Sequence, residues 1–198
     1  MRRPRTQRDA QADAESAEAH AKRVNTDAAW QVAADAWEIA GNMRRARHAT
    51  LRQPGFGSET RRRLAAWQAA EREFWRKDQR FRRGGLSREE VLIIDRAAGT
   101  TRPTNEEISE LEVADFLRDP PLHLFAYYSD DSDLITNFMG APLGEITRRG
   151  ARSRAFGRGT FLQHVTVTAI NGYYYSGTCN LETGTYCKLK RGKVWRRR

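Results

Sequence analysis

The sequence predicts an α+β protein, in which a helical N-terminal region is followed by a small antiparallel β-barrel of SH3-like or OB-like type. Apolar residues recur with helical spacing as far as Asp119. Pro120 and Pro121 then end the last helix, because proline cannot continue one. After them, short runs with the strand period of two are separated by glycines, which is typical of small barrels.

These patterns divide the 198 residues into three parts. Residues 1–23 are polar and Ala-rich, and we expect an arm that is either a solvated helix or unfolded. Residues 24–119 are the helical region, and residues 120–198 are the basic barrel with its Arg-rich tail. We expect the barrel to dock against the helical half, because a domain of this size is small for independent stability.

Two long helical patterns in the helical region carry aromatic stripes. Trp30 and Trp37 are seven residues apart in the first pattern, and Trp67, Phe74 and Phe81 repeat at the same spacing in the second. Residues seven apart share a helix face, so the pattern predicts an αα-hairpin held together by the two stripes. The opposite face of the second helix is rich in Arg, which indicates either a solvated face or non-specific contact with phosphates.

Two capping boxes, Ser87–Glu90 and Thr104–Glu107, predict two short helices joined by a turn. We do not interpret this pair as a DNA-binding helix-turn-helix, because the second helix is strongly acidic and would repel phosphates. That helix is predicted to pack or to bind protein, with Ile108, Leu111 and Leu117 on its buried side.

The charge is positive and unevenly distributed. The chain has 35 Lys and Arg residues against 25 Asp and Glu residues, a net charge of +10. From Pro121 onward there are 12 basic and five acidic residues, which leaves +7 on the barrel region. A basic domain indicates a polyanionic partner, nucleic acid first.

The sequence also bears on the compartment. Met1 is followed by RRPRTQRDAQ rather than by a secretory signal, and no apolar segment approaches the ~18 residues of a membrane span. We therefore expect a cytoplasmic protein without membrane contact. In that compartment Cys179 and Cys187 are expected to be reduced, although adjacent strands would allow them to pair.

The segment VTVTAINGYYYSGTCN, residues 165–180, predicts a β-hairpin. Asn171-Gly172 suits a two-residue type I′ turn, because both residues tolerate the positive φ that the turn requires. This register places Tyr174 in the core, on the face of Val165, Val167 and Ala169. Tyr173 and Tyr175 then stand on the more polar face, either as an ordinary Thr/Tyr sheet surface or as a platform for stacking.

Two basic clusters flank this hairpin. One is the predicted loop with Arg148, Arg149, Arg152, Arg154 and Arg158, and the other is the last strand and tail with Lys188, Lys190, Arg191 and Lys193. Cations that follow phosphates, beside aromatic rings that stack on bases, are typical of single-strand binding. The sequence therefore predicts non-enzymatic binding of DNA or RNA with low sequence specificity. The alternative is a host or viral protein partner for the aromatic helical region.

Catalytic motifs are missing from the sequence. It contains no P-loop, GxSxG, HExxH or paired-carboxylate pattern, so we predict no cofactor, no metal site and no enzyme. Asp130, Asp131 and Asp133 form an acidic cluster that could hold a divalent ion, but without the order of a calcium loop. Asp is also an ordinary turn residue, so a metal-dependent enzyme is the weaker alternative.

The C-terminal 65 residues carry a family resemblance. LITNFMGAPLGEI and VTVTAINGYYYSGTCNLETGTYCKLKR have an IT-x-x-x-G-x-x-LG opening and an AING-x-x-Y-x-GT close. These motifs resemble small, uncharacterised β-domain proteins encoded by bacteriophages and prophages. The resemblance implies a phage context and no particular activity, and it does not extend to the helical half.

Overall fold

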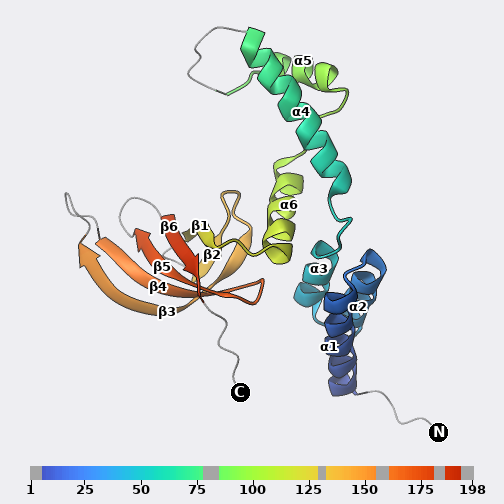
Figure 1. Ribbon diagram of the computed structural model, residues 1–198, viewed down its shortest axis with the longest axis vertical. Coiled ribbons are helices and arrows are strands. Elements are labelled where there is room, and N and C mark those ends of the chain that lie inside the picture. Colours follow the sequence, from blue (N-terminus) through green and yellow to red (C-terminus); the bar gives the residue numbers. More distant parts are fainter. Residues whose placement is uncertain (1–5, 78–84, 129–132, 155–160, 181–185, 193–198) are drawn as a thin grey trace.

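The computed structural model describes residues 6–77, 85–128, 133–154, 161–180 and 186–192. Figure 1 shows helices in the N-terminal part and a barrel in the C-terminal part, which confirms the α+β class. None of the helices in these described ranges is long and apolar enough to cross a membrane. The helices are α1 (Gln7–Val24), α2 (Asp27–Ile39), α3 (Met43–Leu51), α4 (Ser58–Lys77), α5 (Arg88–Ala98) and α6 (Asn105–Arg118).

Helix α1 covers most of the expected arm of residues 1–23 and corresponds to the helical one of the two alternatives, but it is packed against other helices rather than solvated. Thr6 and Asp9 form a capping box at its start, which satisfies free backbone N–H groups of the first turn. Ala10, Ala14 and Ala21 are buried and pack with α2 and α3 in two small clusters. Small side chains let the helices approach closely, so a segment with little hydrophobic character still packs.

The predicted pairing of the two aromatic helices is wrong. Trp30 and Trp37 of α2 pack with the alanines of α1 and α3. Helix α4 instead lies against α5, where the indole N–H of Trp67 donates to the carboxylate of Asp95 (2.9 Å). The α2 stripe is buried, whereas on α4 Trp67 is buried, Phe74 is half-buried and Phe81 lies outside the described residues. A stripe also does not specify which helix covers it.

Helix α6 lies between the helices and the barrel (Figure 1). Its apolar side joins the barrel core through Val113, Ala114, Phe116 and Leu117. Its acidic side meets arginines of α3 and α4, in the ion pairs Arg47–Glu110, Arg61–Asp115 and Arg63–Glu107. The acidic character of α6 is therefore matched within the chain.

The barrel is an up-and-down meander in which every strand pairs antiparallel with the next, and the last returns to the first. Register shifts after Ile146 and Arg149 bend the long third strand. That strand also continues to Arg154, so part of the predicted Arg-rich loop is strand. The strands are β1 (His123–Tyr128), β2 (Leu134–Thr136), β3 (Pro142–Arg154), β4 (Phe161–Ala169), β5 (Tyr174–Asn180) and β6 (Tyr186–Arg191).

The β4–β5 hairpin turns one residue differently from the prediction. Its loop has three residues, Ile170, Asn171 and Gly172, and only the glycine has positive φ (+86°). The backbone N–H of Gly172 donates to the carbonyl of Ala169 (3.0 Å), as in a turn followed by a left-handed glycine. Thr168 therefore pairs with Tyr174, and the predicted parity of the tyrosines is reversed.

The two cysteines form a disulfide, contrary to the expected reduced thiols. Cys179 of β5 and Cys187 of β6 lie directly opposite each other, with 4.1 Å between their Cα atoms. Both side chains are completely buried in the barrel core. The expectation rested on compartment alone, whereas the strand register brings the two sulfur atoms together.

Candidate nucleic-acid interface

The tyrosines predicted to bind are held by the protein itself. Tyr175 is fully buried, where its O–H donates to the carbonyl of Pro121 (3.0 Å) and its ring centroid lies 5.9 Å from that of Phe116. Burial raises the pKa of its phenol. Tyr173 is half-buried, and the guanidinium of Arg191 lies 5.1 Å from the centre of its ring. Neither ring is a free platform.

The predicted basic residues separate into two groups. Two of them are engaged: Arg149 pairs with Asp133 (2.7 Å), and Arg191 donates to the carbonyl of Pro120. The exposed ones are Arg148, Arg152, Lys188 and Lys190. Arg154 lies on β3 opposite Phe161 in the backbone register, and Arg158 and Lys193 lie outside the described residues.

Three of the exposed cations lie on the outside of the closed barrel, Lys188 and Lys190 on β6 and Arg148 three strands away on β3. Opposite residues on neighbouring strands form a row across the outer surface, Arg148–Thr166–Ser176–Lys190–His123. The next row contains His164, Thr178, Lys188 and Phe125. Neighbouring strands are about 4.8 Å apart, so Arg148 and Lys190 are separated by roughly 14 Å along the sheet.

Beside these lysines lie four exposed aromatic residues, which we call the aromatic patch: Phe125, Tyr127, Phe138 and Tyr186. Their side chains are 52%, 37%, 80% and 42% exposed, respectively. The Phe125 and Tyr186 rings are stacked with centroids 5.9 Å apart, and Tyr127 makes edge contacts with Tyr186 (5.9 Å) and Phe138 (6.2 Å). Four rings in mutual contact at a protein surface are more than scattered exposed apolar residues.

Strand alternation positions three members of the aromatic patch. Phe125 and Tyr127 point outward from β1 because Leu124, Ala126 and Tyr128 fill the core. Tyr186 lies opposite Tyr127, and Lys188 lies opposite Phe125.

The fourth member, Phe138, sits in the β2–β3 loop, which Asn137 fixes. The Asn137 amide donates to the Glu112 carboxylate (2.8 Å) and to the Ser109 hydroxyl (3.2 Å), both on α6. Its side-chain oxygen accepts from the backbone N–H of Ala141 (2.8 Å), which closes the loop. The loop that carries Phe138 is thus held in place by α6.

The electrostatics of this surface suit an anion. The outward positions of β1, β4, β5 and β6 within their described residues hold lysine, histidine, hydroxyl and aromatic side chains, together with Leu162 and Asn180, and no carboxylate. Glu145 on β3 lies in the row of Thr168 and Tyr174 and faces Arg44 of α3 (3.5 Å). Toward α6, Phe125 lines a pocket together with the carboxylates of Glu112, Asp115 and Asp119. An aromatic surface with lysines can stack its rings on bases and neutralise phosphates.

The aromatic patch is not evident from the sequence alone. In HLFAYY both alternating sets are apolar, so the pattern does not say which set faces outward. Phe138 and Tyr186 are also far apart in sequence, and only the barrel brings them together. The available signal was the alternation in YCKLKR, where Cys187 and Leu189 point inward and Tyr186, Lys188 and Lys190 point outward.

The acidic cluster considered for a metal is only partly described. Asp130 and Asp131 lie outside the described residues, and Asp133 is paired with Arg149. In the part of the chain that the structure describes, no three His, Cys, Asp or Glu side chains gather as a metal site would require.

No known protein-family model, curated protein or solved structure matches this chain.

Proposed function

We propose that this protein binds single-stranded nucleic acid, DNA or RNA, on the outer face of its barrel, without catalysis and with little sequence preference. The observation that carries the proposal is the aromatic patch beside Lys188 and Lys190. The phage setting that the resemblance implies is retained as part of the proposal.

The rings and the lysines of this surface can recognise different parts of a nucleic acid. Every base offers a π-face, so ring stacking tolerates any sequence, and each stacked base contributes roughly 1–3 kcal/mol. The lysines supply charge that follows the backbone without reading bases. A regular duplex hides its base faces within the stack, which favours a single strand as the ligand.

The first test removes two aromatic rings from the aromatic patch. Phe125→Ala/Tyr186→Ala takes away the stacked pair, and we expect the affinity for a labelled single-stranded oligonucleotide to fall about tenfold or more in fluorescence anisotropy. The matched control is Leu92→Ala/Ile93→Ala, which removes two apolar side chains that are 50% and 53% exposed on α5. Equal binding by the ring variant and the wild type would refute stacking on this face.

Charge is tested by the salt dependence of the same binding. Lys188→Gln/Lys190→Gln should lower the slope of log Kd against log salt concentration by about 1.4, since each phosphate contact on a single strand contributes about 0.7. The control Arg72→Gln/Arg96→Gln removes the same charge from exposed positions on α4 and α5. If both variants change the slope equally, the affinity is a property of net charge and not of the barrel face.

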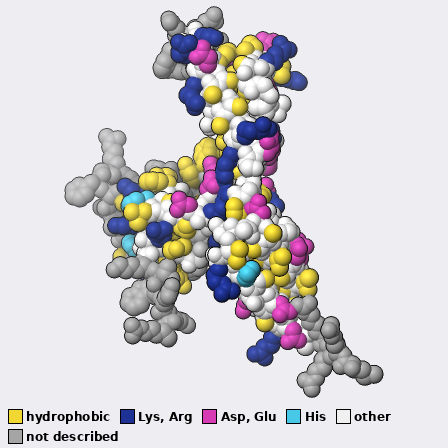
Figure 2. Space-filling view, turned by 45° about the vertical axis from the view of Figure 1, so that its right-hand side comes forward, with side chains coloured by type: hydrophobic (Ala, Val, Ile, Leu, Met, Phe, Trp, Pro, Cys, Tyr) yellow, Lys and Arg dark blue, Asp and Glu magenta, His cyan; other side chains and the backbone are white. Residues whose placement is uncertain are grey.

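A second candidate function is binding of a host or viral protein through α4 and α5. Leu92 and Ile93 are exposed on α5, and a groove of about 800 Å³ between α4, α5 and α6 is lined by apolar residues that include Leu64, Trp75 and Val91. Figure 2 shows hydrophobic side chains among Lys and Arg on this arm of the molecule. Cross-linking in the natural host, with Leu92→Glu/Ile93→Glu as the comparison, would show a partner lost with these side chains.

A further inference from the structure

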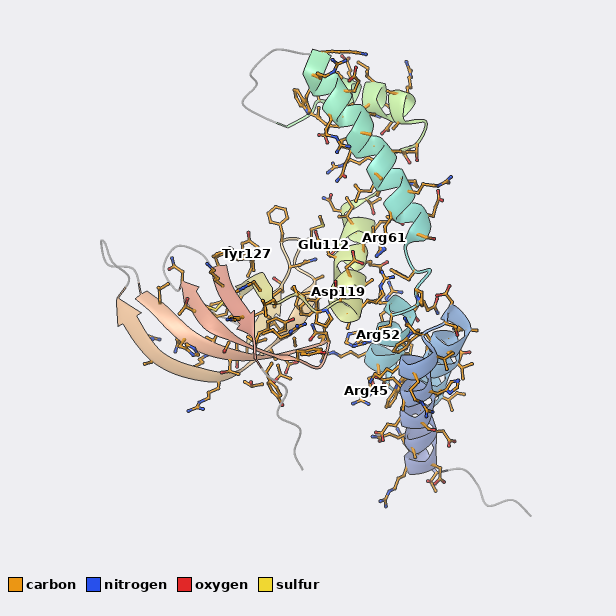
Figure 3. The ribbon with its side chains drawn as sticks, in the orientation of Figure 1. Arg45, Arg52, Arg61, Glu112, Asp119 and Tyr127 are labelled. Carbon is orange, nitrogen blue, oxygen red and sulfur yellow. A yellow bond between two sulfur atoms is a disulfide. The ribbon has the colours of Figure 1, made fainter. Side chains whose placement is uncertain are left out.

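A cleft lies at the junction of the helical half and the barrel, and its residues have no part in the proposed function. Its volume is about 410 Å³, and it lies between α1, α2, α3 and the tip of the β4–β5 hairpin. Arg45, His48 and Arg52 line it from α3, and Lys22 lines it from α1. The spacing of these residues, three and four apart, places them on one helix face. Figure 3 shows Arg45 and Arg52 on the side of α3 that faces the barrel.

The two arginines are held in a way that leaves their hydrogen-bond donors free. The guanidinium of Arg45 lies over the ring of Trp37 (4.5 Å) and that of Arg52 over the ring of Trp30 (5.6 Å). Because the rings cover the faces, the N–H edges point elsewhere. Among the residues that the structure describes, neither guanidinium donates a hydrogen bond or forms an ion pair.

The two carboxylates that line the cleft, Glu15 and Glu18, already interact with other side chains of the protein. Glu18 pairs with Lys22 (2.6 Å) and accepts from the indole N–H of Trp37 (2.9 Å). Glu15 accepts from the side-chain amide of Gln11 (3.1 Å). In the part of the chain that the structure describes, neither carboxylate forms a direct ion pair with Arg45 or Arg52, although Glu18 interacts electrostatically with both arginines.

His48 lies among these charges. Burial first, and then the guanidinium groups of Arg44 and Arg52, lower the pKa of His48 to about 4; Glu18 opposes this shift, and its effect exceeds the further lowering by Arg45. Burial also lowers the pKa of Arg52. A half-buried guanidinium without a partner is costly, and a bound anion would offset that cost.

We propose that this cleft binds a ligand carrying more than one phosphate group, held by the free N–H edges of Arg45 and Arg52. Arg45 and Arg52, the C-cap residue of α3, are seven positions apart, a rise of about 10 Å along the helix, which suits a ligand with several phosphate groups better than one small anion. The guanidinium edge matches phosphate oxygens in geometry as well as charge. The source of the phosphates is either a small polyphosphate compound or a nucleic-acid backbone.

The first experiment uses the unmodified chain of 198 residues. The imidazole resonance of His48 is titrated with pH by NMR, with and without sodium tripolyphosphate, against sodium chloride at matched ionic strength. Tripolyphosphate is expected to raise the pKa of His48 by about one unit or more, because an anion within about 6 Å favours the protonated ring. A pKa that stays the same in both salts would overturn the proposal.

The second experiment measures tripolyphosphate affinity by calorimetry in two charge-matched variants. Arg45→Gln/Arg52→Gln should weaken binding about tenfold or more, while Arg72→Gln/Arg96→Gln should leave it within about twofold of the wild type. Equal losses in both variants would overturn the proposal, since net charge would then explain the binding. Thermal unfolding confirms that each variant is folded, and if the first is not, the His48 titration decides.

The final comparison identifies the source of the phosphates and separates this cleft from the aromatic patch. A single-stranded oligonucleotide that displaces tripolyphosphate and shifts the His48 resonance would assign the site to a nucleic-acid backbone. An oligonucleotide without either effect would assign it to a small polyphosphate compound. The variant Phe125→Ala/Tyr186→Ala should retain tripolyphosphate binding. The proposal for the barrel face and the proposal for the cleft can therefore be refuted independently.

Discussion

At the scale of single residues, one extra residue in a loop decides which tyrosine is structural. Asn171 is buried at the hairpin tip, where its amide donates to the carbonyl of Phe116 (3.2 Å) and its side-chain oxygen accepts from the N–H of Tyr173 (3.0 Å). These contacts stabilise a three-residue loop, and the register then turns Tyr175 inward. The Asn-Gly pair correctly predicted a turn, but the partner that sets the loop length lies on α6, distant in sequence.

This register predicts opposite consequences for two neighbouring tyrosines. Tyr175→Ala should destabilise the protein by about 3–5 kcal/mol, because it leaves a cavity beside Phe116 and removes a buried hydroxyl. Tyr174→Ala should change stability by no more than about 0.5 kcal/mol, since Tyr174 is 44% exposed on the outer face. Urea unfolding of the two variants measures both effects. If Tyr174→Ala were instead the more destabilising substitution, the hairpin would have the two-residue turn, and the register that pairs Thr168 with Tyr174 would be wrong.

At the scale of elements, the sequence predicts whether a segment has the helical or the strand period better than it predicts which face of that segment is buried. The change of period after Pro121 correctly located the strands, and Val165, Val167 and Ala169 are buried as their alternation predicts. β1 shows the limit, because Phe125 and Tyr127 are as apolar as the residues between them. The outward side of such a strand is decided by which set fits the barrel interior, a property of the closed sheet.

Close approach of strands inside the barrel makes Gly177 a sensitive position. A Cβ atom built there would lie 2.1 Å from the carbonyl oxygen of Lys188 on β6, a backbone atom that cannot move without parting the strands. We expect Gly177→Ala to destabilise the protein by about 1–3 kcal/mol or more. The control is Gly85→Ala, where the added Cβ would meet no atom within 4 Å. Thermal unfolding compares them, and similar melting temperatures would show that β5 and β6 are farther apart than described.

At the scale of the whole molecule, α6 holds the two halves together. Phe116 and Leu117 lie in the barrel core, Asn137 and Asn171 bring two barrel loops to the same helix, and arginines of α3 and α4 pair with its acidic side. The prolines after Asp119 mark where the period changes. The local sequence pattern does not reveal that the barrel core also includes residues of α6, before these prolines. The contacts between α6 and the barrel loops join residues 25 to 55 positions apart in the sequence.

This arrangement predicts that the barrel needs α6 in order to fold. A fragment of residues 104–198 keeps the capped helix, whereas a fragment of residues 120–198 loses the burial of Phe116 and Leu117, each contributing roughly 1.5–3 kcal/mol. Small domains are stable by only about 5–15 kcal/mol, so that loss is a large fraction of the total. The longer fragment should therefore show dispersed amide resonances and a cooperative thermal transition, and the shorter one should not.

The fragment comparison also addresses the functional surface, because α6 fixes Phe138 through Asn137. If the barrel folds equally well without α6, the core is complete within residues 120–198 and the helix is a detachable neighbour. If it folds only with α6, the aromatic patch and the helix form one unit, and substitutions in α6 should weaken nucleic-acid binding without touching the ligand. Glu112→Gln, which keeps the shape of the side chain but weakens its hydrogen bond to Asn137, is the variant that distinguishes these cases by anisotropy.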